Sequence, residues 1–142
     1  MARLIGMNHV ALEVRDLDEA LDFLGRVFEF ELRGRVPGMA FVDMGDQFLA
    51  LAERRSAAPG DEAHFGLVVD DVEDARRGLE RAGAEILPSR GLRFRDPSRN
   101  VVEVVSYTDV QFTKDRQVLR GMGLDLEKSE GAQRELEGKR LL

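Results

Sequence analysis

The stretch HVALEVRDLDEAL, residues 9–21, is similar to a second stretch of the same chain, HFGLVVDDVEDAR, residues 64–76. Each copy opens with one of the chain's two histidines, His9 and His64. A short alternating strand then leads to an aspartate, further acids and an apolar periodic run, which together indicate the start of a helix. Five pairs keep the same offset: Leu12 and Leu67, Val14 and Val69, Asp16 and Asp71, Ala20 and Ala75, Leu24 and Leu79. The chain therefore contains an internal repeat, and the repeat decides the fold.

Each copy continues with three short strands separated by turn residues such as Pro37-Gly38. The sequence predicts an α+β fold of two tandem βαβββ modules, about residues 5–55 and 61–107, within a domain spanning residues 1–107. A segment rich in turn residues, 56–60, is the predicted hinge. The predicted strands cover residues 29–36, 39–44 and 47–53 in the first module, and 84–88, 92–95 and 100–106 in the second.

The alternation of the two opening strands predicts which side chains share a face. Successive side chains of a strand point to opposite faces, so Val10, Leu12 and Val14 are expected to face the helix. His9 then points to the other face, and the matching strand repeats this arrangement with His64. We expect the two imidazoles to meet on the side that the curved sheet encloses.

Glu103 is a third candidate, because it is a charged residue within the apolar run of residues 100–106. A carboxylate there is costly unless it is paired, hydrogen-bonded or bound to a metal. Two imidazoles and one carboxylate suit a divalent first-row ion and leave positions open for water or substrate. The equivalent position of the first module holds Ala50, and the alternative role for Glu103 is an ion pair with Arg93 or Arg95.

Three stretches, HVALEVRDLDEALDFL, HFGLVVDDVEDARRGLERAGAEIL and FRDPSRNVVEVVSY, carry a resemblance to a known family. Over about residues 5–107 the chain resembles the vicinal oxygen chelate superfamily, also called the glyoxalase/bleomycin resistance/dioxygenase family. The resemblance implies a U-shaped mixed sheet around one divalent ion (Fe, Mn, Ni, Co or Zn). It places the ligands at His9, His64 and Glu103, with Ala50 where a fourth ligand can stand.

The resemblance does not select one reaction. Glyoxalase I and methylmalonyl-CoA epimerase carry a ligand at the position of Ala50, whereas fosfomycin-modifying thiol transferases and extradiol dioxygenases have a similar three-ligand set. The extradiol enzymes use a further histidine that this chain lacks, and the fosfomycin enzymes have a threonine where Ala11 stands.

The resemblance therefore implies a metalloenzyme acting by Lewis-acid chemistry on a small substrate with vicinal oxygens. Its class, whether lyase, isomerase, thiol transferase or dioxygenase, stays open. The alternative is a metal-free protein of the same fold that sequesters a small molecule such as an antibiotic.

Further residues are candidates for the site. Glu103 itself or Glu13, which shares a face with His9, could transfer a proton. Substrate contacts are expected among Phe41, Phe48, Phe94 and Tyr107, although at least one of the phenylalanines is expected to be ordinary core.

Composition narrows the remaining functions. The 142-residue chain has a formal net charge of −6 and no block of lysine or arginine, which argues against nucleic acid as a partner. It has no cysteine, so disulfides and thiolate chemistry are excluded. The absence of a long apolar run or secretion signal favours a cytoplasmic protein away from membranes.

Two expectations concern assembly. Family members usually pair modules across two chains, so the resemblance implies a homodimer. The segment 108–142 lies outside the repeat, and residues 125–136 predict a charged amphipathic helix with sparse apolar anchors. This C-terminal helical extension is expected to pack on the dimer partner or at the cavity mouth.

Overall fold

Two βαβββ units follow one another along the chain, as the repeat predicts. The structure, a computed structural model, describes residues 1–54 and 63–141, so the predicted hinge at 56–60 lies outside the described residues. The first unit comprises β1 (Leu4–Val14), α1 (Leu17–Val27), β2 (Leu32–Val36), β3 (Met39–Met44) and β4 (Gln47–Glu53). The second comprises β5 (His64–Val69), α2 (Val72–Arg81), β6 (Glu85–Leu87), β7 (Leu92–Arg95) and β8 (Val101–Ser106).

Both helices begin at the aspartates that the repeat singles out. The side chain of Asp16 accepts a hydrogen bond from the backbone N–H of Glu19 at 2.7 Å, and that of Asp71 accepts one from Asp74 at 2.9 Å. These bonds satisfy N–H groups that have no partner within the helix. After α2 the chain turns at Gly83 with φ of 68°, the left-handed conformation that glycine adopts most readily. No helix in the described part of the chain is long and apolar enough to cross a membrane.

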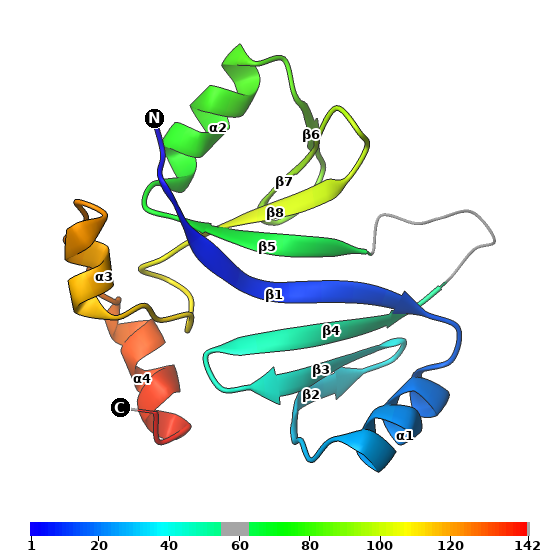
Figure 1. Ribbon diagram of the computed structural model, residues 1–142. Helices are drawn as coiled ribbons and strands as arrows, with labels where there is room; N and C mark the ends of the chain where they lie inside the picture. Colours follow the sequence, from blue (N-terminus) through cyan, green and yellow to red (C-terminus); the bar gives the residue numbers. More distant parts are fainter. Residues whose placement is uncertain (55–62, 142) are drawn as a thin grey trace.

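The two units share one mixed eight-stranded sheet with the order β2-β3-β4-β1-β5-β8-β7-β6 (Figure 1). β1 and β5 pair antiparallel at its centre, and each runs parallel to the last strand of its own unit, β4 or β8. The first strands of the two repeats are thus direct neighbours. The α+β fold class is confirmed.

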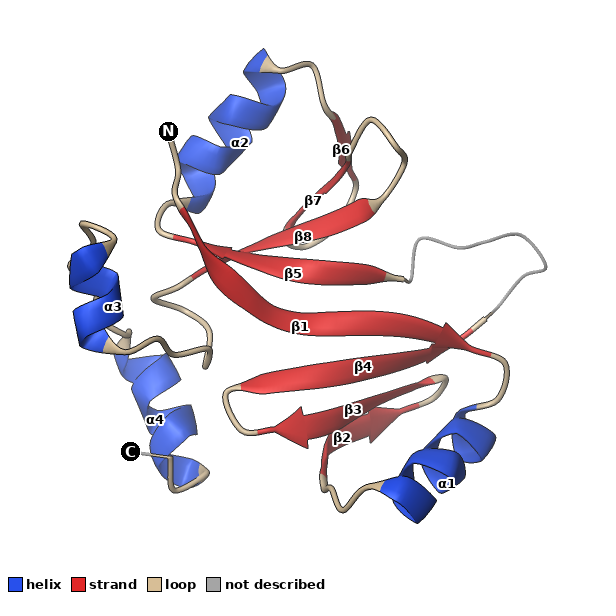
Figure 2. Cartoon of the chain, viewed as in Figure 1, coloured by secondary structure: helices blue, strands red, loops and turns tan. Residues whose placement is uncertain are grey.

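One face of the sheet carries α1 and α2, which lie at opposite ends of it (Figure 2). α1 covers an apolar cluster that includes Leu17, Val42 and Leu51, and α2 covers a second cluster around Leu92 and Val104. Burying these side chains is the main favourable contribution to the stability of each unit.

The central strands of this outer face are not covered by the helices. Val14 packs into the α1 cluster as expected, but Val10 and Leu12 are 40% and 46% exposed. The expectation that all three face a helix was wrong for these two, because each helix packs over the strands that flank the central pair.

The homodimer that the family resemblance implies stays a prediction.

The C-terminal segment forms two helices, α3 (Arg116–Gly121) and α4 (Glu130–Gly138). The expected helix within 125–136 begins later, because the side chain of Ser129 accepts from Ala132 N and caps α4. α3 was not expected from the sequence. Both helices lie beside the end of the sheet where β1 and β4 begin (Figure 1).

This segment packs on the face of the sheet opposite α1 and α2. Its apolar side chains, which include Phe112 and Leu119, form a cluster with Ile5 of β1 and Val68 of β5. Val68 shares a face with His64, since the two residues are four positions apart in one strand. The segment therefore covers one end of the face that carries the histidines.

Lys128 links two parts of the C-terminal segment, the chain before α4 and the loop after β8. Its Nζ donates to the carbonyl oxygens of Tyr107, Phe112 and, at 2.9 Å, Val110, and it lies 3.5 Å from the centroid of the Tyr107 ring. One ammonium group thus satisfies three carbonyls of the loop that leads from β8 to α3.

We expect Lys128→Met to destabilise the protein by about 1–3 kcal/mol, because it leaves three carbonyls of a partly buried loop without their donor. Urea unfolding measures the free energy, and limited proteolysis shows whether cleavage concentrates after residue 107. The matched control is Arg134→Met, which removes an exposed cation of α4 that pairs only with Glu130 in the described structure. Equal stability of the two variants would contradict the assigned role of Lys128.

Candidate metal centre

Strand register brings the three candidate ligands to one face of the sheet. His9 pairs with Gly66, and Gly66 pairs with Glu103, so these residues form one row across β1, β5 and β8. His64 lies in the adjacent row, opposite Ala11. Because residues opposite one another in paired strands point to the same face, the side chains of His9, His64 and Glu103 converge.

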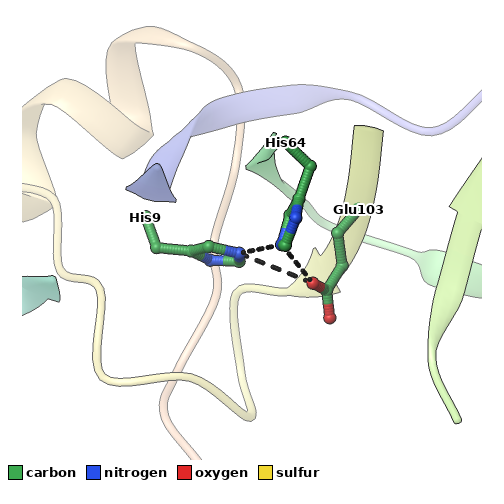
Figure 3. Close-up of side chains that lie close together, drawn as sticks. All are labelled: His9, His64 and Glu103. Atoms are coloured by element: carbon green, nitrogen blue, oxygen red, sulfur yellow. Dashed lines mark hydrogen bonds and ion pairs between the residues drawn. The ribbon is translucent and has the colours of Figure 1, made fainter. Parts of the chain in front are cut away.

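Each of the three side chains contributes one atom that lies close to the other two (Figure 3). Nε2 of His9 lies 3.1 Å from Nε2 of His64. Oε2 of Glu103 lies 3.5 Å from the first nitrogen and 3.3 Å from the second. Both histidines are buried, whereas Glu103 is partly open to solvent. The group is a potential metal-binding cluster within the described residues.

Asn8 fixes the proton on His9. Its side-chain Oδ1 lies 2.9 Å from Nδ1 of His9, and because an amide oxygen can only accept, Nδ1 carries the hydrogen. Nε2 then presents its lone pair to His64 and Glu103. A hydrogen bond donated by the ring nitrogen that does not bind the metal orients metal-binding histidines in proteins.

Sequence reasoning missed Asn8, and a break in strand register explains why. Regular alternation would send Asn8 and His9 to opposite faces. The pairing of β1 with β5 shifts between Met7 and His9, and both Asn8 and His9 are buried. A β-bulge changes the face to which a side chain points, and no residue type in this stretch predicts a bulge.

Arg93 contacts two of the three converging atoms. Its Nη2 lies 3.2 Å from Nε2 of His64 and 3.2 Å from Oε2 of Glu103. The ion pair with Glu103 that the sequence left as an alternative is therefore present together with the cluster of ligands. Arg95, the other possible partner, pairs instead with Glu85.

The environment keeps Glu103 ionised. The close contacts of the carboxylate with the imidazoles of His64 and then His9 lower the pKa of Glu103 far below its ordinary value, and the charge of Arg93 adds to their effect although burial opposes the shift. Glu103 is consequently a carboxylate at any ordinary pH.

The donor set fits a divalent ion. Donors about 2.1 Å from one ion are about 3.0 Å apart at right angles and about 3.4 Å apart at the tetrahedral angle. The separations of 3.1 and 3.3 Å fall in this range, and that of 3.5 Å lies just above it. Acceptor atoms that face one another so closely also need a cation between them or an added proton on one ring.

The fourth quasi-symmetric position is apolar. Ala11 pairs with Ala50 in the first unit as Gly66 pairs with Glu103 in the second, so Ala50 occupies the place that corresponds to Glu103. Both alanines are buried and carry no donor atom. An ion held here would keep that side open for water or substrate.

Aromatic side chains close one side of the cluster. Phe48 stacks on the ring of His9 with centroids 4.7 Å apart and planes 6° apart, and Phe41 meets Phe48 edge-on at 5.9 Å. Arg33, which the sequence did not single out, lies 4.8 Å from the Phe48 centroid. Phe48 and Phe41 thus form a wall beside His9.

Two of the expected substrate contacts lie elsewhere. Phe94 packs under α2 in the outer cluster, so it is the phenylalanine that belongs to the core. Tyr107 is 4% exposed and packs with Phe112 in the cluster of the C-terminal segment.

Glu13 lies on the same face as His9, near the end of β1. One of its oxygens, Oε2, is 3.2 Å from Nε of Arg54, and the other, Oε1, is buried without a hydrogen-bond partner among the described residues. Glu13 pairs with Ala52, which places it one row beyond the row of Ala11 and His64. A role for it in proton transfer stays a prediction.

An open cavity of about 320 Å³ adjoins His9 on the side of the C-terminal segment. β1 and β4 line it with Asn8, His9 and Phe48, and the C-terminal segment adds Phe112 and Lys114. The expected position of this segment at a cavity mouth agrees with this arrangement.

Comparison with known proteins identifies relatives of this fold. A family model described as Glyoxalase/Bleomycin resistance protein/Dioxygenase superfamily matches residues 6–104. The Mn(II)-bound glyoxalase from Novosphingobium aromaticivorans is similar over 89% of this chain with a TM-score of 0.61 and 20% identity, and this chain spans 46% of that one.

Two further structures share the fold. A methylmalonyl-CoA epimerase from Streptomyces coelicolor matches 73% of this chain and 98% of its own, with a TM-score of 0.58 and 16% identity. A superfamily member from Vibrio splendidus 12B01 matches 75% and 99%, with a TM-score of 0.53 and 16% identity.

We expect Gly66→Ala to damage the cluster, because a Cβ at this position would collide with Oδ1 of Asn8 and the ring of His9. Overpacking of this kind costs about 1–3 kcal/mol, which thermal unfolding can measure. The control is Gly78→Ala in α2, where a Cβ would meet only ordinary contacts. There the substitution should stabilise the helix by about 1 kcal/mol. A neutral Gly66→Ala would show that the side chains are not packed as described.

Proposed function

Since this chain belongs to the glyoxalase/bleomycin resistance protein/dioxygenase superfamily, we propose that it is a divalent-metal-dependent enzyme acting on a small substrate with vicinal oxygens. The observation that carries the proposal is the convergence of His9, His64 and Glu103 on one point, with donor atoms 3.1–3.5 Å apart. Buried imidazoles and a carboxylate that is ionised at ordinary pH are ready to bind an ion without first losing a proton from Glu103.

The proposed roles follow from the contacts. His9, His64 and Glu103 would hold the ion, and Asn8 keeps Nε2 of His9 unprotonated. A bound divalent ion would act as a Lewis acid that withdraws electron density from the substrate oxygens. The Mn(II)-bound glyoxalase makes Mn²⁺ the first ion to try, with Fe²⁺, Ni²⁺, Co²⁺ and Zn²⁺ beside it.

The row beyond His64 carries small side chains. Ala11 and Ala50 continue this row, whereas the space over Gly66 is filled by the side chains of Asn8 and His9. Phe48, stacked on His9, keeps water from that side of the ring. A compact substrate could therefore approach the point where the three donor atoms meet.

Proton transfer needs a different residue from the ligands. A carboxyl whose pKa is held as low as that of Glu103 is a weak proton acceptor, so a ligand role suits it better than that of a general base. Glu13 remains the candidate because it lies on the same face and one of its oxygens is unpartnered among the described residues. The reaction class stays open among lyase, isomerase, thiol transferase and dioxygenase.

A second candidate function is metal-free sequestration of a small molecule. The contact of Arg93 with Glu103 favours it, because a guanidinium can balance the carboxylate without an ion. A measurement of metal binding distinguishes the metal-dependent enzyme from the metal-free sequestering protein.

The decisive test strips the protein with a chelator and reloads it separately with each of the five ions. We expect about one ion per chain and a higher melting temperature, since a ligand at 100 times its Kd adds about 2.7 kcal/mol to the free energy of unfolding. Glu103→Gln should weaken binding by more than about 100-fold, because it removes the only charged ligand.

Glu85→Gln is the matched control, since Glu85 pairs with Arg95 and Arg99 on the same sheet but not with the histidines. Its metal affinity should equal that of the wild type. If no ion binds while circular dichroism shows an intact fold, the enzyme proposal fails and sequestration becomes the better account.

Asn8→Leu tests the support of His9. The substitution keeps the size of the side chain but removes the acceptor for Nδ1–H, so metal affinity should fall by about 10–100-fold. Calorimetric titration with Mn²⁺ measures the change. An affinity within twofold of the wild type would show that Asn8 does not orient the ring.

A further inference from the structure

Arg93 stands where an ion and a substrate would meet. It lies on β7 directly opposite Glu103 on β8, so both side chains point to the same face. Its side chain is 28% exposed, and the guanidinium therefore has an open path toward solvent. Its described contacts within hydrogen-bond range are Nε2 of His64 and Oε2 of Glu103.

The contact of Arg93 with His64 and the binding of a metal ion by His64 cannot occur at the same time. A guanidinium nitrogen can only donate, so its contact with Nε2 of His64 uses the single lone pair of that nitrogen. An ion bound to His64 needs the same lone pair, and it would also repel the guanidinium at close range. Arg93 must therefore move away from His64 when an ion enters.

We propose that Arg93 is the anion-binding residue of this centre, which balances Glu103 in the metal-free protein and, displaced by the ion, binds a carboxylate or similar planar anion of the substrate. The inference rests on the proposed metal-dependent function and names its substrate class: a small molecule with an anionic group beside the chelating oxygens. A guanidinium suits this task because its parallel N–H groups match the two oxygens of a carboxylate.

The distribution of charge supports an anionic ligand. The chain has a formal net charge of −6, yet Arg33 and Arg93 flank the cluster from opposite sides. Arg33 lies over Phe48, is about as exposed as Arg93, and its nearest described acid, Glu135, is 4.0 Å away. A divalent ion would add positive charge beside these two guanidinium groups and attract an anion despite the acidic surface.

A supporting role for Arg93 makes the opposite prediction about metal affinity. If Arg93 served to hold Glu103 in place for the ion, its removal would weaken metal binding. If it competes with the ion, as the shared lone pair of His64 requires, its removal strengthens metal binding. The sign of the change therefore separates the two roles.

The experiment measures two quantities by calorimetric titration. One is the affinity of the stripped protein for Mn²⁺, and the other is the preference of the Mn²⁺-loaded protein for glycolate over its neutral analogue glycolamide. Arg93→Met should bind Mn²⁺ about tenfold more tightly than the wild type, because the competing cation is gone. Its preference for glycolate over glycolamide should fall by about tenfold.

Arg95→Met is the matched control, since Arg95 lies two residues along the same strand and face and pairs with Glu85. It should leave both quantities within twofold of the wild type. Arg93→Lys keeps the charge but loses the planar fork, so it should retain the Mn²⁺ affinity of the wild type and lose glycolate preference. This variant tests anion binding even if Arg93→Met does not fold.

Unchanged or weaker Mn²⁺ binding by Arg93→Met, or an unchanged preference for glycolate in both Arg93 variants, would overturn the inference while leaving the proposed function intact. If neither the wild type nor Arg93→Met binds any ion, the proposed function itself fails. Binding by Arg93→Met alone would support competition at His64 but would contradict the proposed metal-dependent function of the wild type.

Discussion

The antiparallel pairing of β1 with β5 is the contact on which the site depends. It joins the two units into one sheet and sets His9 beside Gly66 and Ala11 beside His64. Each histidine is thereby opposed by a small residue, and the two imidazoles can turn toward each other over the pair of strands. A shift of one residue would send one histidine to the outer face, because side chains alternate along a strand.

The repeat is symmetric in backbone but not in chemistry. Ala50 and Glu103 occupy matching places beside Ala11 and Gly66, yet one is apolar and the other is charged. The second unit therefore supplies the carboxylate and the guanidinium, while the first supplies Asn8 and the stacked Phe48. The second unit provides the charged groups, and the first unit provides the residues that hold the neutral ligand His9. Because Ala50 carries no donor atom, one side of the centre stays open for a substrate.

The C-terminal segment adds a boundary that the repeat lacks. It packs on Ile5 and Val68, brings Phe112 and Lys114 to the cavity beside His9, and is held together by the three carbonyl contacts of Lys128. A sheet open on its inner face at both ends would leave these apolar side chains in water, so covering one end stabilises the fold.

The sequence by itself determined the two βαβββ units, the helix starts at Asp16 and Asp71, and the shared face of His9, His64 and Glu103. These features follow from local rules, namely strand alternation and helix capping, applied twice to a repeated pattern. Only the tertiary structure decided the contact of Asn8 with His9, that of Arg93 with His64, and the exposure of Val10 and Leu12. The reason is physical: a bulge reverses alternation at one residue, while strand pairing and helix placement join residues that are distant in the chain, and neither leaves a periodic trace in sequence.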